Sequence, residues 1–213
     1  MKFQEFENKI VKITKLKLPG EVAQFKMAPM ERLVALKKIA IEKETVRKAG
    51  VLVLFYPSEA KQTMLALILR KTYKGVHSAQ IGFPGGKYEN EDTSLKETAL
   101  RETEEEIGVL RNTVSVLKKL TEVYIPPSNF IVQPYLGITK NTPNFILQEE
   151  EVETLIEVPL IHFMDDTIKI HQNLTTSYAK NIKVPAFLLN NYLVWGATAM
   201  MLSEVREMLK ELL

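Results

Sequence analysis

The sequence predicts a layered α/β or α+β fold in which helices pack on a mixed β-sheet. Short apolar runs rich in Val, Leu and Ile are typical of strands. Stretches with apolar residues at helical spacing lie near both ends and in the middle of the chain, and turn residues separate the two kinds of segment. The chain has 213 residues, 46% of them hydrophobic, which suits one domain with an extension, or two domains at most.

The first 45 residues are expected to form an N-terminal helical extension. Residues 2–16 carry apolar side chains at helical spacing, and Pro19-Gly20 ends the expected helix. Residues 31–44 are expected to form a second, shorter helix or an irregular arm. We therefore divide the chain into an extension, 1–45, and a main domain, 46–213, that includes the last helix.

A strand pair is predicted at residues 51–56 and 64–69, on either side of the turn residues Pro57-Ser58-Glu59. Residues 71–92 contain Gly, Pro, Asn and Asp and show no regular spacing of apolar residues, so they are expected to form a loop. The remaining elements expected are strands over 115–124, 131–138, 152–158 and 167–171, and a closing helix over 193–212.

A helix is predicted between Ser94 and Gly108. Ser94 suits an N-cap, and Glu97, three residues later, completes a capping box. Glycine is a common residue just after the end of a helix, so Gly108 marks the expected end.

Three carboxylates gather on one face of this predicted helix. At about 100° per residue, Glu102, Glu105 and Glu106 share one arc, apart from the apolar stripe. Their like charges repel, and a divalent cation would relieve the repulsion. Oxygen ligands favour magnesium or manganese over zinc. The alternative is a solvated acidic face, but the flexible glycines just upstream, Gly85 and Gly86, favour a site for a phosphorylated ligand.

Composition excludes several classes of site. The chain has no cysteine, so disulfides, thiolate zinc sites, iron–sulfur clusters and a cysteine nucleophile are excluded, and a cytoplasmic location is expected. No apolar run approaches the roughly 18 residues of a membrane helix, and the charged N-terminus lacks the apolar core of a signal peptide. Residues 1–50 hold twelve basic and six acidic residues, but no aromatic interleaving or nucleic-acid motif. We therefore expect neither a membrane nor a nucleic-acid partner.

The loop and the helix together resemble the Nudix box. That box is a Gly, five residues, a Glu, seven residues, then Arg-Glu, an aliphatic residue, any residue, Glu-Glu, any residue, Gly and an aliphatic residue. The second half matches at Arg101-Glu102, Glu105-Glu106 and Gly108-Val109, with Thr103 at an aliphatic position. In the first half, Asp92 stands where the family has Glu, and eight residues rather than seven precede Arg101. The resemblance covers roughly residues 45–205.

The element before the box is similar to that of the coenzyme A pyrophosphatase branch of the Nudix hydrolases. Arg70 and Phe83-Pro84-Gly85-Gly86 match that element in register, whereas Gly75 stands at its second arginine position. Later segments with counterparts in the branch are Tyr124-Ile125-Pro126-Pro127, Glu151-Val152, Val158-Pro159-Leu160 and 194–199.

The resemblance implies an α/β/α sandwich with a mixed sheet between helices. It also implies a hydrolase that uses Mg²⁺ or Mn²⁺ to cleave a nucleoside diphosphate linked to another moiety. The implied metal ligands are Glu102, Glu105 and Glu106, together with the backbone carbonyl near Gly86. Arg101 is implied to orient the carboxylates and keep them ionised.

A general base would activate the attacking water. The candidates are a member of the set Glu102, Glu105 and Glu106, and an acid of the later run over 149–151. Within that run Glu151 is favoured, because it matches the family's Glu-Val. The alternative is that this run is a polar loop before the next strand.

For coenzyme A or acyl-coenzyme A, hydrolysis would give 3′,5′-ADP and (acyl-)4′-phosphopantetheine. Arg70 is the first candidate to bind the substrate's phosphates, followed by Arg47 and Lys48, with Gly85 and Gly86 in the approach loop. His77 is a candidate substrate contact, and the alternative for it is a solvated or capping role. The alternative substrates are ADP-ribose, a dinucleotide or a damaged nucleotide, and a non-catalytic nucleotide-binding module is a further alternative. The first and last helices offer surfaces for a homodimer.

Overall fold

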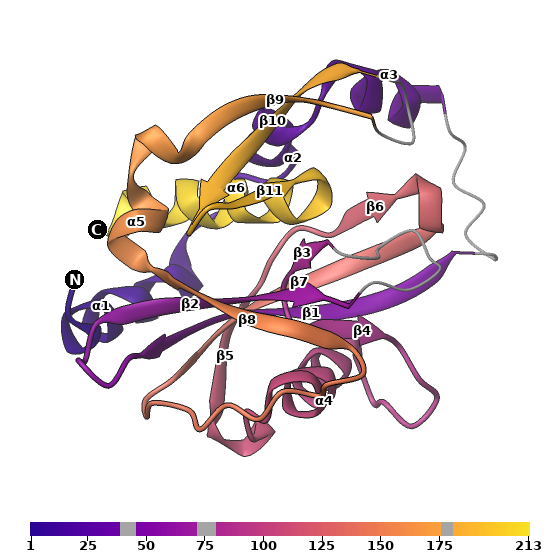
Figure 1. Ribbon diagram of the computed structural model, residues 1–213. Coiled ribbons are helices and arrows are strands. Elements are labelled where there is room, and N and C mark those ends of the chain that lie inside the picture. The colour runs from indigo at the N-terminus through magenta and orange to yellow at the C-terminus, as the bar shows by residue number, and fades with distance from the viewer. Residues whose placement is uncertain (39–45, 72–79, 176–180) are drawn as a thin grey trace.

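The computed structural model describes residues 1–38, 46–71, 80–175 and 181–213 (Figure 1). Within these residues, eight strands form a mixed sheet with the path β3-β2-β1-β7-β5; β4 pairs with β1, β6 with β7, and β8 with β2. The strands are β1 (Arg47–Pro57), β2 (Thr63–Arg70), β3 (Ile81–Gly82), β4 (Gly85–Lys87), β5 (Val114–Lys119), β6 (Val123–Ile125), β7 (Phe130–Thr139) and β8 (Val152–Pro159).

Strand β1 lies at the centre of this sheet, parallel to β7 and antiparallel to β2 and β4. Successive side chains of a strand point to opposite faces. Val53 and Phe55 accordingly join the core on one face, whereas Leu52 and Leu54 join the core on the other. Both faces are covered, which explains the unbroken apolar run of β1.

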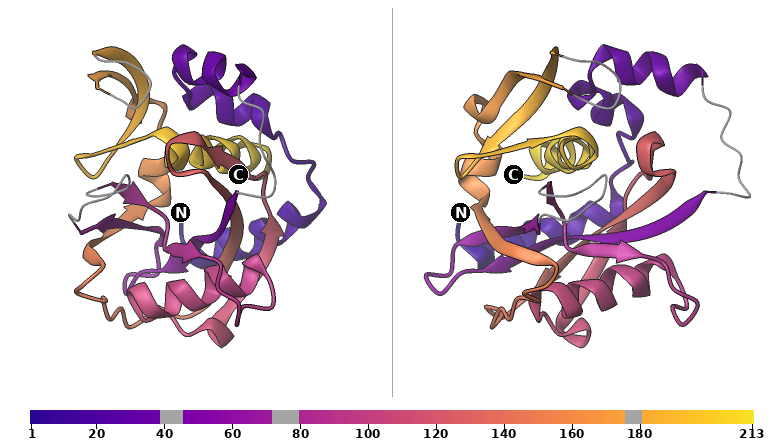
Figure 2. Two further views of the ribbon diagram at one scale, coloured as in Figure 1. Left: turned by 90° about the vertical axis from the view of Figure 1, so that its right-hand side faces the viewer. Right: turned by 45° about the vertical axis from the view of Figure 1, so that its right-hand side comes forward.

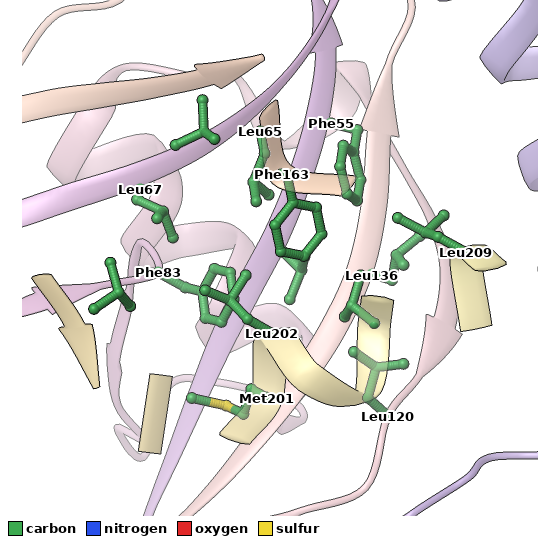
Figure 3. Packing of buried hydrophobic residues seen from close by; sticks show 14 of the residues in the cluster. Phe55, Leu65, Leu67, Phe83, Leu120, Leu136, Phe163, Met201, Leu202 and Leu209 are labelled. Atoms are coloured by element: carbon green, nitrogen blue, oxygen red, sulfur yellow. The ribbon is translucent and has the colours of Figure 1, made fainter. Parts of the chain in front are cut away.

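Helices cover both faces of the main sheet (Figures 1 and 2). Helix α4 (Leu95–Ile107) packs on one face, and α6 (Gly196–Leu212) packs on the other with α1 (Phe3–Ile10). Figure 3 shows Met201 and Leu202 of α6 among buried side chains of the sheet such as Phe55 and Leu136. The predicted α/β/α sandwich is confirmed.

A second sheet of the described residues, with the order β11-β10-β9, lies beyond α6 (Figure 1). Its strands are β9 (Lys169–Leu174), β10 (Ile182–Leu189) and β11 (Tyr192–Trp195). The described residues also form three further helices: α2 (Glu21–Gln24), α3 (Met30–Lys38) and α5 (Leu160–Met164). The 3₁₀ turns are Val11–Lys15, Phe25–Met27, Arg111–Thr113, Pro126–Ser128 and Asp166–Ile168. None of the helices described is both long and apolar enough to cross a bilayer.

The helix predicted between Ser94 and Gly108 is confirmed as α4. The hydroxyl of Ser94 accepts a hydrogen bond from the backbone N–H of Glu97 at 3.3 Å. Gly108 has φ 73° and closes the helix in the left-handed conformation that glycine adopts without steric cost. The first predicted helix is α-helical only to Ile10, because a 3₁₀ turn over Val11–Lys15 follows it.

Other expected boundaries were wrong. Residues 115–124 form two strands, β5 and β6, since the chain turns aside at Thr121, whose N–H and hydroxyl both donate to Glu204 of α6. The closing helix begins at Gly196 rather than at residue 193, because β11 occupies the preceding residues. The predicted loop over 71–92 contains the short strands β3 and β4, and strand β10 was not predicted.

Candidate active site

Helix α4 is held close to β1 at Gly50. A Cβ atom at this position would lie 2.1 Å from the carbonyl oxygen of Leu95 and 3.0 Å from the backbone nitrogen of Ala99. Only glycine permits this approach of helix to strand. The apolar stripe of α4, which includes Thr103 and Ile107, is buried as predicted.

Two carboxylates of α4 and a third from the residue before β8 meet in one cluster. One oxygen from each of Glu102, Glu106 and Glu151 lies within 4.8 Å of the others. Glu102 and Glu106 are one helical turn apart on α4, and Glu151 directly precedes β8. Clustered carboxylate oxygens are the donor set that Mg²⁺ or Mn²⁺ prefers.

Glu106 is the most buried member of this cluster, with 1% of the residue exposed. Its Oε2 accepts a hydrogen bond from the backbone N–H of Gly85 at 2.7 Å, and its Oε1 lies 2.9 Å from Nη1 of Arg70. Burial raises the pKa of Glu106 to about 7, against the opposing effects of Arg70 and the Gly85 N–H. Burial also raises the pKa of Glu102.

The carboxylate cluster fits a divalent cation. The Oε1 atom of Glu106 is buried and accepts no hydrogen bond from any described residue, since its contact with Arg70 is a charge pair without hydrogen-bond geometry. Arg70 supplies this oxygen with charge but no hydrogen bond, and a metal ion that accepts its lone pair would complete its environment. A metal ion would favour the ionised forms of Glu102 and Glu106, which burial disfavours.

Arg101 connects the acidic residues around the cluster. Its Nε and Nη2 donate to the two carboxylate oxygens of Asp92, at 2.9 and 3.1 Å. Its Nη2 lies 3.1 Å from Oε1 of Glu102, and its Nη1 donates to Oε2 of Glu105 at 2.8 Å. The side chain of Glu105 is 54% exposed and lies outside the group of three carboxylates. The sequence placed Glu105 on the metal-binding face, whereas here it pairs with Arg101.

The glycine loop passes directly over Glu102. Strand β4 pairs with β1 so that Gly85 lies opposite Val51 and Gly86 opposite Gly50. Gly85 has φ 143°, and a Cβ atom there would lie 2.4 Å from the Gly50 carbonyl oxygen. A Cβ atom on Gly86 would lie 2.3 Å from the carboxylate of Glu102. Gly85 is therefore required by both its backbone conformation and its contacts, whereas at Gly86 only the contact with the Glu102 side chain favours glycine.

A cavity of about 540 Å³ adjoins the glycine loop. Its charged lining residues, within the part of the chain described, are Arg32, Arg70 and Lys87, and all three are basic. Aromatic and aliphatic side chains, including Phe130 and Trp195, supply most of the remaining wall. A pocket that combines a few cations with apolar walls suits an anionic ligand with an organic body.

The predicted phosphate-binding residues fall into separate groups. Arg70, Gly85 and Gly86 line the cavity. Arg47 and Lys48 are exposed on β1 and do not line it. His77 lies outside the described residues.

Arg47 has contacts of its own. Its guanidinium lies over the ring of Phe130, 4.3 Å from the ring centroid, and it donates a hydrogen bond to the carbonyl of Ser128. Arg47 therefore supports one wall of the cavity from outside.

Sequence reasoning missed Arg32, Phe130 and Trp195 as lining residues. Trp195 is half-buried on the cavity wall. The contact between Arg70 and Glu106 was also missed, since it joins β2 to α4 across the sheet. Only the basic or aromatic character of these residues could have signalled a site.

Known proteins resemble this chain over the same region. Residues 46–171 match the NUDIX domain family. The peroxisomal coenzyme A diphosphatase ndx-8 of Caenorhabditis elegans is 27% identical over 139 residues, which cover 65% of this chain and 59% of that protein. The uncharacterized Nudix hydrolase NudL of Yersinia pestis (strain Pestoides F) is 33% identical over 160 residues, which cover 73% of this chain and 76% of that protein.

Solved structures share the fold. The Nudix hydrolase RenU from M. smegmatis has a TM-score of 0.54 at 14% identity, covering 78% of this chain and 87% of its own. A MutT/nudix family protein from Enterococcus faecalis has a TM-score of 0.51 at 16% identity, and the match covers 92% of this chain and 76% of that protein. With the matched domain and the carboxylate cluster beside its glycine loop, the chain belongs to the Nudix hydrolase family, whose members act on pyrophosphate bonds.

Proposed function

We propose that this enzyme hydrolyses coenzyme A or acyl-coenzyme A, giving 3′,5′-ADP and (acyl-)4′-phosphopantetheine. One observation carries the proposal: Arg70 touches Glu106 of the carboxylate cluster and also lines the 540 Å³ cavity, whose charged lining residues are all basic. A substrate in this cavity would therefore present its diphosphate to the carboxylates. The similarity to the C. elegans coenzyme A diphosphatase supports this substrate class.

Glu102 and Glu106 would hold Mg²⁺ or Mn²⁺ together with the carbonyl near Gly86, and Glu105 is an alternative ligand, which leaves Glu151 of the cluster as the base. When bound, the metal ion supplies charge neutralisation at the diphosphate and lowers the pKa of a water molecule.

The remaining side chains would position the reactants. Asp92 fixes the guanidinium of Arg101, and Arg101 in turn positions the carboxylates of Glu102 and Glu105. Arg70 would bind a phosphate oxygen as a planar, always-charged donor. Glu151 is exposed, so it can accept a proton from water while its neighbours Glu102 and Glu106 stay buried or half-buried.

ADP-ribose, a dinucleotide or a damaged nucleotide is the alternative substrate. The observation that favours it is Gly75, which stands where the coenzyme A branch has a second arginine. A cytoplasmic location and a homodimer stay predictions from the sequence.

A substrate panel tests the proposal. The pure protein is incubated with coenzyme A, acetyl-coenzyme A, ADP-ribose and diadenosine tetraphosphate, each with Mg²⁺, with Mn²⁺ or with a chelator. We expect 3′,5′-ADP from the coenzyme A substrates only when metal is present. Glu106→Gln should abolish turnover, whereas Glu97→Gln, which removes an acid from the same helix away from the cluster, should retain it. Robust turnover of ADP-ribose without release of 3′,5′-ADP from coenzyme A would contradict the assignment.

A further inference from the structure

Arg32 belongs to α3, a helix that lies outside the matched NUDIX domain of residues 46–171. Only 4% of the residue is exposed. Its Nη2 donates a hydrogen bond of 2.9 Å to the carbonyl oxygen of Tyr124 on β6. This bond holds the guanidinium beside β6, at a cavity that residues of α6 also line.

Arg32 and Arg70 border the same cavity from opposite sides of β1. Arg70 ends β2, on one side of β1, whereas Tyr124 lies on β6, which pairs with β7 on the other side. Three strand spacings of about 4.8 Å separate β2 from β6, or roughly 14 Å across the sheet. The two arginines therefore mark two cationic regions of one cavity.

Only one of these regions lies at the carboxylate cluster. Arg70 contacts Glu106, and Lys87 follows directly after the glycine loop. Arg32 is the charged lining residue near β6, as far as the structure describes the chain. The first turn of α6, from Gly196 to Thr198, lines the cavity as well and adds positive potential to it.

We propose that Arg32 is a specificity-determining residue that binds a phosphate group carried by the substrate away from its scissile diphosphate. The inference rests on the proposed function, and in coenzyme A this group is the 3′-phosphate. A buried guanidinium binds phosphate through parallel N–H donors, and the low-polarity walls strengthen the attraction. The N-terminal segment would thus supply a recognition element that the matched domain lacks.

The competing explanation is that Arg32 has a structural role alone, through contacts such as its hydrogen bond to Tyr124. A structural role would lower the activity on all substrates alike, whereas phosphate recognition would raise the KM only for substrates with the remote phosphate. The pair coenzyme A and 3′-dephospho-coenzyme A differs in that group alone, so it separates the two explanations.

The experiment measures kcat and KM for both substrates in the wild-type chain of 213 residues and in Arg32→Gln, Arg32→Lys and Arg111→Gln. Arg111 is an exposed arginine remote from the cavity lining and serves as the matched control. For Arg32→Gln we expect the KM for coenzyme A to rise about 10- to 100-fold, the range of a lost charge-assisted hydrogen bond. The KM for the dephospho substrate and both kcat values should change less than about threefold. Arg32→Lys should lie between, and Arg111→Gln should match the wild type.

Binding gives a readout that needs no turnover. Calorimetry compares 3′,5′-ADP with 5′-AMP on the wild type and the same variants, and we expect the preference for 3′,5′-ADP to fall in Arg32→Gln. Equal losses on both ligands, or an unchanged preference, would overturn the inference. If Arg32→Gln does not fold, the preference for 3′,5′-ADP over 5′-AMP is measured in Arg32→Lys. An unchanged preference in that variant would also overturn the inference. A wild type that prefers 3′,5′-ADP but does not hydrolyse coenzyme A contradicts the proposed reaction and leaves the role of Arg32 supported.

Discussion

The guanidinium of Arg101 forms two hydrogen bonds to the carboxylate of Asp92, from Nε to Oδ1 at 2.9 Å and from Nη2 to Oδ2 at 3.1 Å. Asp92 also accepts hydrogen bonds from the Glu89 N–H and the Thr98 hydroxyl. The box resemblance has Glu here and one residue fewer before Arg101. The shorter Asp side chain still reaches Arg101 because Thr98 and the Glu89 N–H fix its carboxylate beside α4.

Asp92→Asn should destabilise the protein by about 3 kcal/mol, since it removes one partner of a largely buried ion pair. Urea unfolding should show a lower midpoint with the same m-value. Glu91→Gln removes the neighbouring exposed acid and should leave the midpoint unchanged. A midpoint shift of the same size in both variants would contradict a specific role for the pair.

The same pair predicts an acid-dependent loss of stability. The hydrogen bonds from Arg101 hold the pKa of Asp92 well below its usual range. Its contribution is complete above the ordinary Asp pKa of about 3.9, and is lost as the pH falls from there toward the folded pKa. The wild-type unfolding free energy should therefore fall more steeply below about pH 4 than that of Asp92→Asn. Parallel pH profiles for the two proteins would refute this assignment.

Metal affinity should depend on pH through Glu106. Burial raises the pKa of this carboxyl to about 7, and a metal ion binds the ionised form. The affinity for Mn²⁺ should therefore rise with pH by up to about tenfold per unit below pH 7 and level off above it. Calorimetry in buffers of different ionisation enthalpy would detect the released proton. Glu106→Gln should flatten the profile, while Glu97→Gln should keep it.

Gly86→Ala should impair catalysis more than stability. The added Cβ would meet the carboxylate of Glu102 at 2.3 Å, and this flexible group can swing away at small cost to the fold. Displacing it by about 1 Å should lower kcat by about 100-fold, with little change in melting temperature.

Gly82→Ala is the matched control for this substitution. Its Cβ would meet only Nε of Arg70, at an ordinary contact distance of 3.7 Å. Near-wild-type kcat in Gly86→Ala would show that Glu102 tolerates the displacement and is not held by the loop.

Glu151→Gln tests the third carboxylate of the cluster. We expect kcat to fall by about 100-fold or more, the range of a lost general base. Glu150→Gln changes the adjacent exposed acid and should retain activity. If the two variants behave alike, the run over 149–151 is a polar loop without a catalytic member.

Local sequence was enough to predict α4, because capping and helical spacing act over a few residues, whereas Gly85 and Gly86 lie on strand β4 rather than in the expected loop. Ser94, Gly108 and the buried stripe through Ile107 all lie where the spacing placed them. The same spacing put Glu105 with Glu102 on one face, but spacing does not include Arg101, whose guanidinium pairs with Glu105.

The sequence by itself determined the fold class, the Nudix family and the side chains on one face of α4. Each of these features depends on residue spacing within a short segment or on a contiguous motif. Only the tertiary structure decided that Glu151 joins Glu102 and Glu106, that Arg70 faces Glu106, and that Arg32 reaches the cavity. These contacts join residues far apart in the chain. Their distances depend on strand order and on the close approach of helix to strand, which no local pattern encodes.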